Sequence, residues 1–333
     1  MEDLPLVSII IPCRNEKEFL PQCLDSILAN HYPHHKIEIL VVDGMSQDGT
    51  RETIKEYIEK YPFIRLLDNP KLITPIALNI GVKNSRNSII IRLDAHAIYK
   101  IDYIFKCVTN LEKYNADNIG GIWVIIPRKN TVIGRGIAKS LSSFFGTGNA
   151  YYKIGSENFK AVDTVPYGCY KKEIFSRIGL FNENLERSQD IEFNTRLKKN
   201  GGKVYLFPEI VGYYYARSTL KEFFVHNFKD GVWAIYPLKF TKILFRPRHY
   251  VPLAFVSLLI LFLSLSFFEQ IFFYFFFGLT FFYLFFLIYF SIKISFLERD
   301  ATFLISLPVA FAVRHFGYGL GSIWGIIKLA VSF

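Results

Sequence analysis

The chain has 333 residues, of which 51% are hydrophobic, and carries a formal net charge of +10. This is enough apolar material for one sizeable core and a further region. From Val251 onward charged residues become scarce and phenylalanine dominates. The cysteines are widely spaced and include no C-x-x-C pair, which excludes a disulfide framework and a structural zinc site. We expect them to be reduced and packed: Cys13, Cys23, Cys107 and Cys169.

The positive charge is concentrated next to the apolar region. Four basic residues directly precede the first apolar span: Lys239, Lys242, Arg246 and Arg248. Positive charge next to a membrane span is expected, because it is attracted to anionic lipid. Zinc-finger, RNA-recognition and basic-zipper signatures are missing from the sequence, so membrane lipids are expected as partners and nucleic acid is not. The first residues lack a basic and then apolar leader, which predicts no signal peptide and a cytosolic catalytic part.

Strands and helices alternate through about residue 125. Short β-branched runs are each followed by a polar loop and then by apolar residues at helical spacing. This order predicts an α/β fold with a mostly parallel sheet. The expected strands are 7–11, 37–42, 64–67, 88–93 and 122–126, the expected helices are 19–28, 50–61 and 74–82, residues 129–143 form a helix or mobile segment, and 146–155 form a flexible loop.

Asp43 stands at the tip of the second expected strand, in a turn rich in aspartate and glycine over residues 43–50. Glycines allow a tight turn, so an ordinary loop is one interpretation. The other is a carboxylate that accepts hydrogen bonds from a nucleobase or from ribose hydroxyls, as in other nucleotide-binding α/β folds. The spacing leaves both interpretations open.

Asp94 and His96 follow the strand at 88–93, at the edge where open α/β sheets bind ligands. Two residues apart in extended chain, their side chains project to one side and can share a divalent cation. An ordinary end of a strand is the alternative.

Asp190 lies in the first turn of a later expected helix. The helix dipole there favours an ionised carboxylate, which suits either a general base or a simple helix cap.

The last third of the chain has the pattern of a membrane-associated region. Thr219 and Glu222 form a capping box that opens an amphipathic helix, expected in the membrane interface with Trp233 and Tyr236 as anchors. Residues 251–268 and 271–292 are expected to form a helical hairpin across the bilayer. The apolar stretch 301–333 contains Pro308, Arg314 and His315, and either spans the membrane or forms a broken or re-entrant helix.

Four segments in this order resemble the motifs of family 2 inverting glycosyltransferases. They read VSIIIPCRNE at 7–16, VVDGMSQDGT at 41–50, RLDAH at 92–96 and QDIEFNTRL at 189–197. Residues 69–70, 75–79 and 315–321 are similar to membrane-bound glucosyltransferases of succinoglycan biosynthesis. The resemblance covers almost the whole chain.

The resemblance implies a GT-A fold, a nucleotide-sugar donor, usually a UDP-sugar, and Mg²⁺ or Mn²⁺. In this chain His96 replaces the second carboxylate of the family's Asp-x-Asp, which favours a metal that tolerates imidazole, such as Mn²⁺. Gln189 replaces a more usual glutamate and leaves the base intact. The implied roles are Pro12, Arg14, Glu16, Asp43 and Asp94 in nucleotide binding, Asp94 and His96 in metal binding, Asp190 as catalytic base, and Gln189, Arg196 and Arg217 in acceptor or diphosphate contacts.

These inferences predict a hexosyltransferase that inverts the anomeric centre and transfers sugar to a lipid-linked glycan or polysaccharide in cell-envelope or exopolysaccharide synthesis. We expect a cytosolic catalytic domain over 1–217, an interface helix and basic linker over 218–249, and a plasma-membrane region with two or three spans over 250–333. An inactive membrane-tethered scaffold is the alternative. A nucleotidyltransferase would need a glycine-rich, basic loop after the first strand, which residues 12–16 do not provide.

Overall fold

A computed structural model describes residues 4–331 and divides the chain into two compact units. The first contains the residues up to Val124 and Gly155–Tyr214, and the second contains Ile125–Ile154 and the residues from Tyr215 onward. Residues 1–3, which belong to the segment used to predict the absence of a signal peptide, lie outside the described residues. So do the last two residues of the third apolar stretch.

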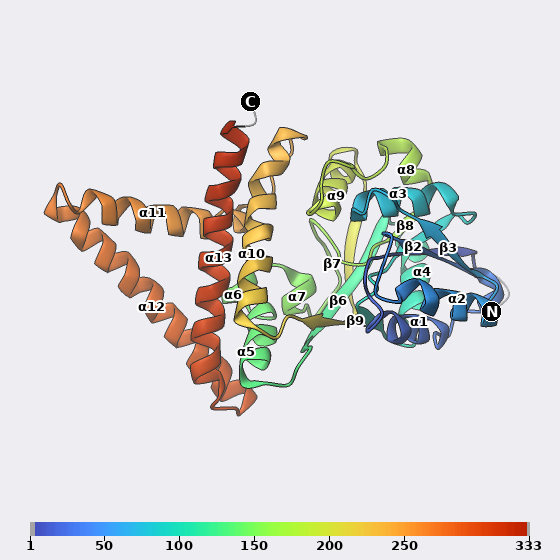
Figure 1. Ribbon diagram of the computed structural model, residues 1–333, viewed down its shortest axis with the longest axis horizontal. Helices are drawn as coiled ribbons and strands as arrows, with labels where there is room; N and C mark the ends of the chain where they lie inside the picture. Colours follow the sequence, from blue (N-terminus) through green and yellow to red (C-terminus); the bar gives the residue numbers. More distant parts are fainter. Residues whose placement is uncertain (1–3, 332–333) are drawn as a thin grey trace. The chain divides into compact units, whose positions relative to one another are not determined.

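The strands form one sheet, nine-stranded within the described residues, in the order β3-β2-β1-β4-β8-β6-β9-β5, with β7 paired to β9 (Figure 1). Their bounds are β1 Val7–Cys13, β2 Ile37–Asp43, β3 Ile64–Asp68, β4 Ile89–Arg92, β5 Ala97–Tyr99, β6 Asn118–Pro127, β7 Lys160–Ala161, β8 Cys169–Lys171 and β9 Val204–Ala216.

The parallel half of this sheet runs from β3 to β4. Val7 of β1 pairs with Ile37 on one side and with Ile89 on the other, both in parallel register. Every residue of β2 is buried, as is typical of a parallel strand covered on both faces. The predicted α/β class is confirmed. The sheet is nevertheless mixed, because β8 joins β4 and β6 antiparallel. Three residues are too few to show a strand period in the sequence.

Helices of the first unit bury the apolar stripes that their sequences predict. In α1 the buried residues are Leu20, Cys23, Leu24 and Ile27, which recur at helical spacing. All four cysteines are free and buried, as expected. The bounds are α1 Leu20–Leu28, η1 His34–Lys36, α2 Thr50–Lys60, α3 Thr74–Asn84, α4 Tyr103–Lys113, α8 Glu173–Ile178 and α9 Gln189–Lys199.

The second unit is helical apart from the ends of two strands. Its helices are α5 Val132–Leu141, α6 Phe144–Thr147, α7 Tyr151–Ile154, α10 Leu220–Ile235, η2 Tyr236–Lys239, η3 Pro247–His249, α11 Val251–Leu265, α12 Gln270–Glu298 and α13 Phe303–Val331. The prediction of a flexible loop at 146–155 was wrong, because α6 and α7 occupy most of it. Ser143 starts α6 by accepting a hydrogen bond from the Gly146 N–H, a cap that the glycines of this segment obscured.

Helix α10 and helix α13 lie side by side along most of their lengths (Figure 1). A Cβ atom at Gly231 would lie 2.0 Å from the Tyr318 carbonyl oxygen, and one at Gly321 would lie 2.0 Å from the Phe228 carbonyl oxygen. Only glycine permits backbones this close, which is how apolar helices pack without bulky side chains. The apolar face of α10 is therefore packed against α13. Its placement in a membrane interface stays a prediction.

Two helices, α12 and α13, are long and apolar enough to cross a membrane. Each has 29 residues, or about 43 Å at 1.5 Å per residue. Helix α13 runs unbroken through Pro308, so of the two forms predicted for this stretch the broken helix is not observed. Helix α11 has 15 residues, about 22 Å, which is shorter than a bilayer core of about 30 Å.

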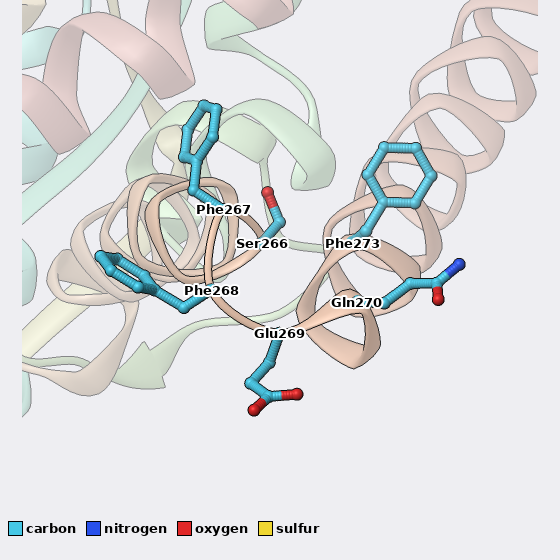
Figure 2. A pocket seen from close by; sticks show the side chains of 6 residues that line it. All are labelled: Ser266, Phe267, Phe268, Glu269, Gln270 and Phe273. Carbon is cyan, nitrogen blue, oxygen red and sulfur yellow. The ribbon is translucent and has the colours of Figure 1, made fainter.

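Helices α11 and α12 are joined by the polar turn expected at Glu269 and Gln270. Both residues also line a pocket at the turn, shown in Figure 2, together with Ser266, Phe267, Phe268 and Phe273. Phe267 and Phe268 are each 83% exposed. Water rarely surrounds aromatic rings to this extent, so the turn has the composition of a segment that contacts lipid or a partner.

Candidate active site

The candidate site is formed within the first unit, at the carboxyl ends of its parallel strands. Asp43 is the last residue of β2, and Asp94 follows β4 by two residues. Asp190 is the second residue of α9, far along the chain. The structure brings Asp94 and Asp190 to the two sides of one guanidinium group, that of Arg92.

Arg92 is the centre of this arrangement. Its Nη2 atom lies 2.7 Å from Oδ1 of Asp94, and its Nη1 atom lies 3.3 Å from Oδ2 of Asp190. The residue is 7% exposed, and its guanidinium stands 5.9 Å from the ring centroid of Tyr167. A buried cation needs such partners. Arg92 is not among the residues for which the sequence predicted a role, although an arginine at the end of a buried apolar strand is an unusual residue in that position.

Asp190 is held beside Arg92. Its Oδ1 atom is buried and has no hydrogen-bond partner within residues 4–331, whereas its Oδ2 atom faces Arg92. Burial raises the pKa of the Asp190 carboxyl, the charge of Asp94 acts in the same sense, and the charge of Arg92 opposes both. Arg92 and the amino end of α9 thus favour the ionised form that burial disfavours. The lone pairs of Oδ1 are not engaged by a donor among the described residues.

Hydrogen bonds from two buried side chains hold the backbone of Asp94 in place. The Tyr99 hydroxyl accepts a hydrogen bond from the Asp94 N–H at 2.8 Å and donates one to the Asp94 carbonyl at 3.1 Å. The Cys23 thiol also donates to this carbonyl, at 3.4 Å. Tyr99 is buried and packs edge-on against Tyr103 and Tyr167. The Asp94 carboxylate is therefore presented by a rigid aromatic platform.

His96 and Glu16 form the other side of the site. The His96 Nδ1 atom lies 3.0 Å from Oε1 of Glu16, and the imidazole packs edge-on against Tyr214. A carboxylate on one ring nitrogen is the usual support of a metal-binding histidine, with the second nitrogen toward the metal. Among residues 4–331, no group of three or more His, Cys, Asp or Glu side chains is placed to hold a metal. Residues 95–96 form a turn and not extended chain, and binding of a cation by Asp94 and His96 stays a prediction.

Asp43 is fully enclosed. Ser46 donates to it twice, through its N–H at 3.0 Å and its hydroxyl at 2.5 Å, and Arg51 Nη1 lies 2.7 Å from Oδ2. Arg51 also binds Asp68 at 2.8 Å. The Asp43 carboxylate thus organises the loop after β2. To contact a nucleobase directly, it must exchange one of these donors for a donor of the ligand.

The other predicted residues have different surroundings. Pro12 is half-buried at the end of β1, and the exposed Arg14 packs against Gly44. Gln189 is 7% exposed at the start of α9. Arg196 binds the Glu192 carboxylate at 2.9 Å and the carbonyls of residues 178–180. Arg217 belongs to the second unit. Their contacts with donor or acceptor stay predictions.

Four of the seven residues other than glycine that have positive φ angles in the described part of the chain lie near these carboxylates. Asn15, Met45, Tyr167 and Ser188 have positive φ angles of 54°, 53°, 49° and 63°. Left-handed backbone at residues other than glycine costs energy and persists where surrounding structure enforces it, most often at functional sites. Asn15 and Met45 follow β1 and β2, and Ser188 precedes Asp190 directly. These residues therefore lie near the same edge of the sheet as the ion pairs of Arg92.

The mixed sheet, the turn rich in aspartate and glycine after β2 and the carboxylates after β4 and in α9 define a GT-A-like glycosyltransferase fold. Residues 8–179 match the sequence profile of "Glycosyl transferase family 2", which is more than half of the chain. The chain belongs to this family and is a glycosyltransferase.

Two of the proteins similar to this chain have names that refer to the synthesis of glycans. The chain is 32% identical over 230 residues to dolichyl N-acetyl-alpha-D-glucosaminyl phosphate 3-beta-D-2,3-diacetamido-2,3-dideoxy-beta-D-glucuronosyltransferase of Methanococcus voltae, covering 68% of this chain and 71% of that protein. It is 26% identical over 228 residues to succinoglycan biosynthesis protein ExoA of Rhizobium meliloti, covering 67% of each. The family expected from the motifs is confirmed.

A solved structure supports the fold over most of the chain. The mannosyltransferase PcManGT from Pyrobaculum calidifontis, determined in complex with GDP-Man and Mn²⁺, superposes with a TM-score of 0.61 at 16% sequence identity. The match covers 94% of this chain and 87% of that protein. At this identity the likeness concerns the fold alone.

Proposed function

We propose that this glycosyltransferase inverts the anomeric centre of a nucleotide-sugar, with Asp190 as general base. The observation that carries the proposal is the unpartnered, buried Oδ1 atom of Asp190, held beside Asp94 by the shared Arg92. A base that is ionised but not hydrogen-bonded on one oxygen can take a proton from an acceptor hydroxyl. A retaining double displacement would need a second nucleophile, and none is nominated among the described residues of the site.

In this proposal Asp190 and Asp94 have different roles. Asp190 accepts the proton of the acceptor hydroxyl while that oxygen attacks the anomeric carbon from the face opposite the leaving diphosphate. Arg92 keeps the Asp190 carboxylate ionised before the transfer. Asp94 and His96 bind the donor side of the site, with Glu16 orienting the imidazole. A divalent cation held by Asp94 and His96 would offset negative charge on the leaving diphosphate.

We further propose a UDP-sugar as donor, Mn²⁺ or Mg²⁺ as the metal, and a lipid-linked glycan as acceptor. The support for the acceptor is the name of the Methanococcus relative, a dolichyl-phosphate-linked sugar transferase, and the two apolar helices long enough to span a membrane. In this proposal α12 and α13 anchor the enzyme in the plasma membrane with the catalytic unit in the cytosol. The basic residues before α11 are consistent with that orientation.

Donor turnover by the full chain in detergent micelles tests the proposal. UDP-, GDP- and TDP-sugars are supplied with Mn²⁺, Mg²⁺ or chelator, and nucleoside diphosphate release is followed. We expect release from one donor only, dependent on metal, and a product whose anomeric configuration, read by NMR, is opposite to that of the donor. Retained configuration would exclude the single displacement. If the nucleotides do not bind at all, the chain is the inactive scaffold instead.

A further inference from the structure

One side of helix α13 is covered by other helices of the second unit. Near its start, a Cβ atom at Gly136 of α5 would lie 2.5 Å from the Cβ atom of Ser306. Near its end, a Cβ atom at Gly325 would lie 2.9 Å from the carbonyl oxygen of Val232 in α10. The covering helices are therefore α5 at the start of α13 and α10 farther along.

The start of α10 lies level with the middle of α13. Gly317 is the central residue of α13, and a Cβ atom there would lie 3.3 Å from the Phe224 carbonyl oxygen. Lys221 and Glu222, both exposed, belong to the turn before Phe224. If α13 crossed a bilayer, its middle would lie at the centre of the hydrocarbon core, and these two charged side chains would lie there too. Charged side chains are costly at that depth.

The polar side chains in the middle of α13 also face the covering helices. The Arg314 Nε atom donates to the Gly146 carbonyl, and its Nη1 atom lies 2.7 Å from Oδ1 of Asn227. The Nε2 atom of His315 lies 2.9 Å from the Phe145 carbonyl oxygen. These partners belong to α6 and α10, so this side of α13 is bound to polar groups of the protein.

The other side of α13 is exposed and apolar. At about 3.6 residues per turn, its exposed large side chains form a stripe that extends from the first turns of the helix to the last. The members of this apolar stripe are Ile305, Val309, Leu320, Trp324, Ile327 and Val331. A helix with one polar, covered side and one apolar side is suited to lie in a membrane surface.

Helices α11 and α12 leave α13 from the side of the apolar stripe. A Cβ atom at Gly319 would overlap the side chain of Val256, and the rings of Phe316 and Phe255 are 5.8 Å apart. Figure 1 shows both helices on the side of α13 that faces away from α10. The hairpin therefore extends in the direction in which the stripe faces.

The hairpin itself has the composition and length of a membrane-crossing element. The apolar residues 271–292 of α12 extend about 33 Å as a helix, against about 30 Å for a bilayer core. Many of its rings are exposed, among them Phe275, Phe281 and Phe285. After this stretch the chain returns to polar protein, since the Arg135 Nη2 atom of α5 lies 3.4 Å from Oδ2 of Asp300.

We propose that α13 lies along the membrane surface with its apolar stripe toward lipid, and that the α11–α12 hairpin is the part of the described chain that crosses the bilayer. Lys239, Lys242 and Arg246, which are exposed and precede α11, then lie beside the headgroups, where anionic lipid attracts them. Both ends of α13 lie on one side of the membrane, and the turn at 266–270 lies on the other. This inference rests on the proposed membrane attachment and not on the proposed chemistry.

Labelling of single cysteines in sealed membranes distinguishes a surface helix from a spanning one. Exposed residues of the full chain are replaced one at a time: Lys221→Cys, Lys242→Cys, Gln270→Cys and Val331→Cys. A membrane-impermeant maleimide is added to intact cells and to inside-out vesicles. The four native cysteines are buried, and the wild type gives their background labelling. Ala301→Cys is the matched control, because the start of α13 lies on the same side whether or not the helix crosses.

We expect Lys221→Cys, Val331→Cys and the control to be labelled from the side of Lys242→Cys, with loss of labelling from the other side. Gln270→Cys should show the reverse. Labelling of Val331→Cys from the side of Gln270→Cys would overturn the proposal, because α13 would then cross. So would Lys221→Cys that reacts only after detergent is added, or Gln270→Cys labelled from the side of Lys242→Cys.

The labelling needs neither donor nor turnover, so its outcome is separate from that of the catalytic proposal. Labelling of Lys242→Cys in intact cells would contradict the proposed cytosolic orientation and leave the surface position of α13 standing. Recovery of the wild-type chain in the soluble fraction would overturn both the membrane attachment and this inference. Normal donor turnover together with a spanning α13 would overturn this inference alone.

Discussion

Arg92 and Asp190 form a buried ion pair, with 3.3 Å between Nη1 of the arginine and Oδ2 of the aspartate. The other arm of the same guanidinium binds Asp94 at 2.7 Å. The proposed base and the proposed donor-side carboxylate are thus coupled through one residue that is almost inaccessible to solvent. Their spacing is fixed before any substrate binds, which is the preorganisation that catalysis requires.

The first prediction concerns the charge of Arg92. Arg92→Gln removes the positive charge that opposes the effect of burial on Asp190, so the pKa of this carboxyl should rise further. Because the base works only when deprotonated, the acid limb of the kcat/KM profile should move to higher pH. Arg92→Lys keeps a charge and should move the limb less. An acid limb at the same pH in all three proteins would contradict this role.

The second prediction concerns the support of the imidazole. Glu16→Gln should raise the Mn²⁺ concentration needed for half-maximal activity by about 10- to 100-fold, because the carboxylate on Nδ1 orients His96 and increases its basicity. Glu18→Gln, exposed two residues away, is the control. Titration of Mn²⁺ against donor turnover measures the effect. If wild type and Glu16→Gln need the same Mn²⁺ concentration for half-maximal activity, His96 is not a metal ligand supported by Glu16.

The third prediction concerns the platform below Asp94. Tyr99→Phe leaves the N–H and carbonyl of Asp94 without the tyrosine hydroxyl, at a cost of about 1–3 kcal/mol in unfolding free energy. Because the carboxylate is less well placed, the Kd of the donor nucleotide should rise more than the stability loss alone explains. Tyr61→Phe, at a half-buried tyrosine that packs against the same core without contacting Asp94, is the control. Isothermal titration and urea unfolding give the two quantities.

The fourth prediction concerns the contact between α10 and α13. Gly321→Ala places a methyl group where only 2.0 Å separates it from the Phe228 carbonyl oxygen, so the backbones must move apart. Overpacking of this kind costs about 1–3 kcal/mol and should lower the Tm. Gly278→Ala is the matched control in α12, where nothing lies within 4 Å. A Tm for Gly321→Ala equal to that of the control would mean that the two helices are not packed this closely.

The parallel core was predictable because its signals are local. β1 and β2 are mostly apolar, β-branched runs that end near Pro12 and Asp43, and such runs indicate buried strands without tertiary information. β8 and α7 were not predictable, because three or four residues show no period. The grouping of 125–154 with the C-terminal helices was missed for another reason. It depends on contacts such as that between Arg135 and Asp300, which no local pattern encodes.

The positions of Asp43, Asp94 and Asp190 at two strand ends and a helix start were predictable from the sequence, whereas their contacts were not. Their functional roles stay predictions. Arg92 was missed, since a lone arginine in an apolar strand gives no spacing to interpret, although its burial required a partner on the same edge. The link between Glu16 and His96 likewise needed the fold, because the two residues come from different strand ends.

The most direct test of the central claim is the turnover of Asp190→Asn measured beside its nucleotide affinity on the same preparation. The amide cannot accept the proton, so turnover should fall by about 100-fold or more while the Kd of the nucleotide stays within a few-fold of wild type. Glu186→Gln, exposed on the same loop, should behave like wild type in both. Turnover near the wild-type rate in Asp190→Asn would show that Asp190 is not the base.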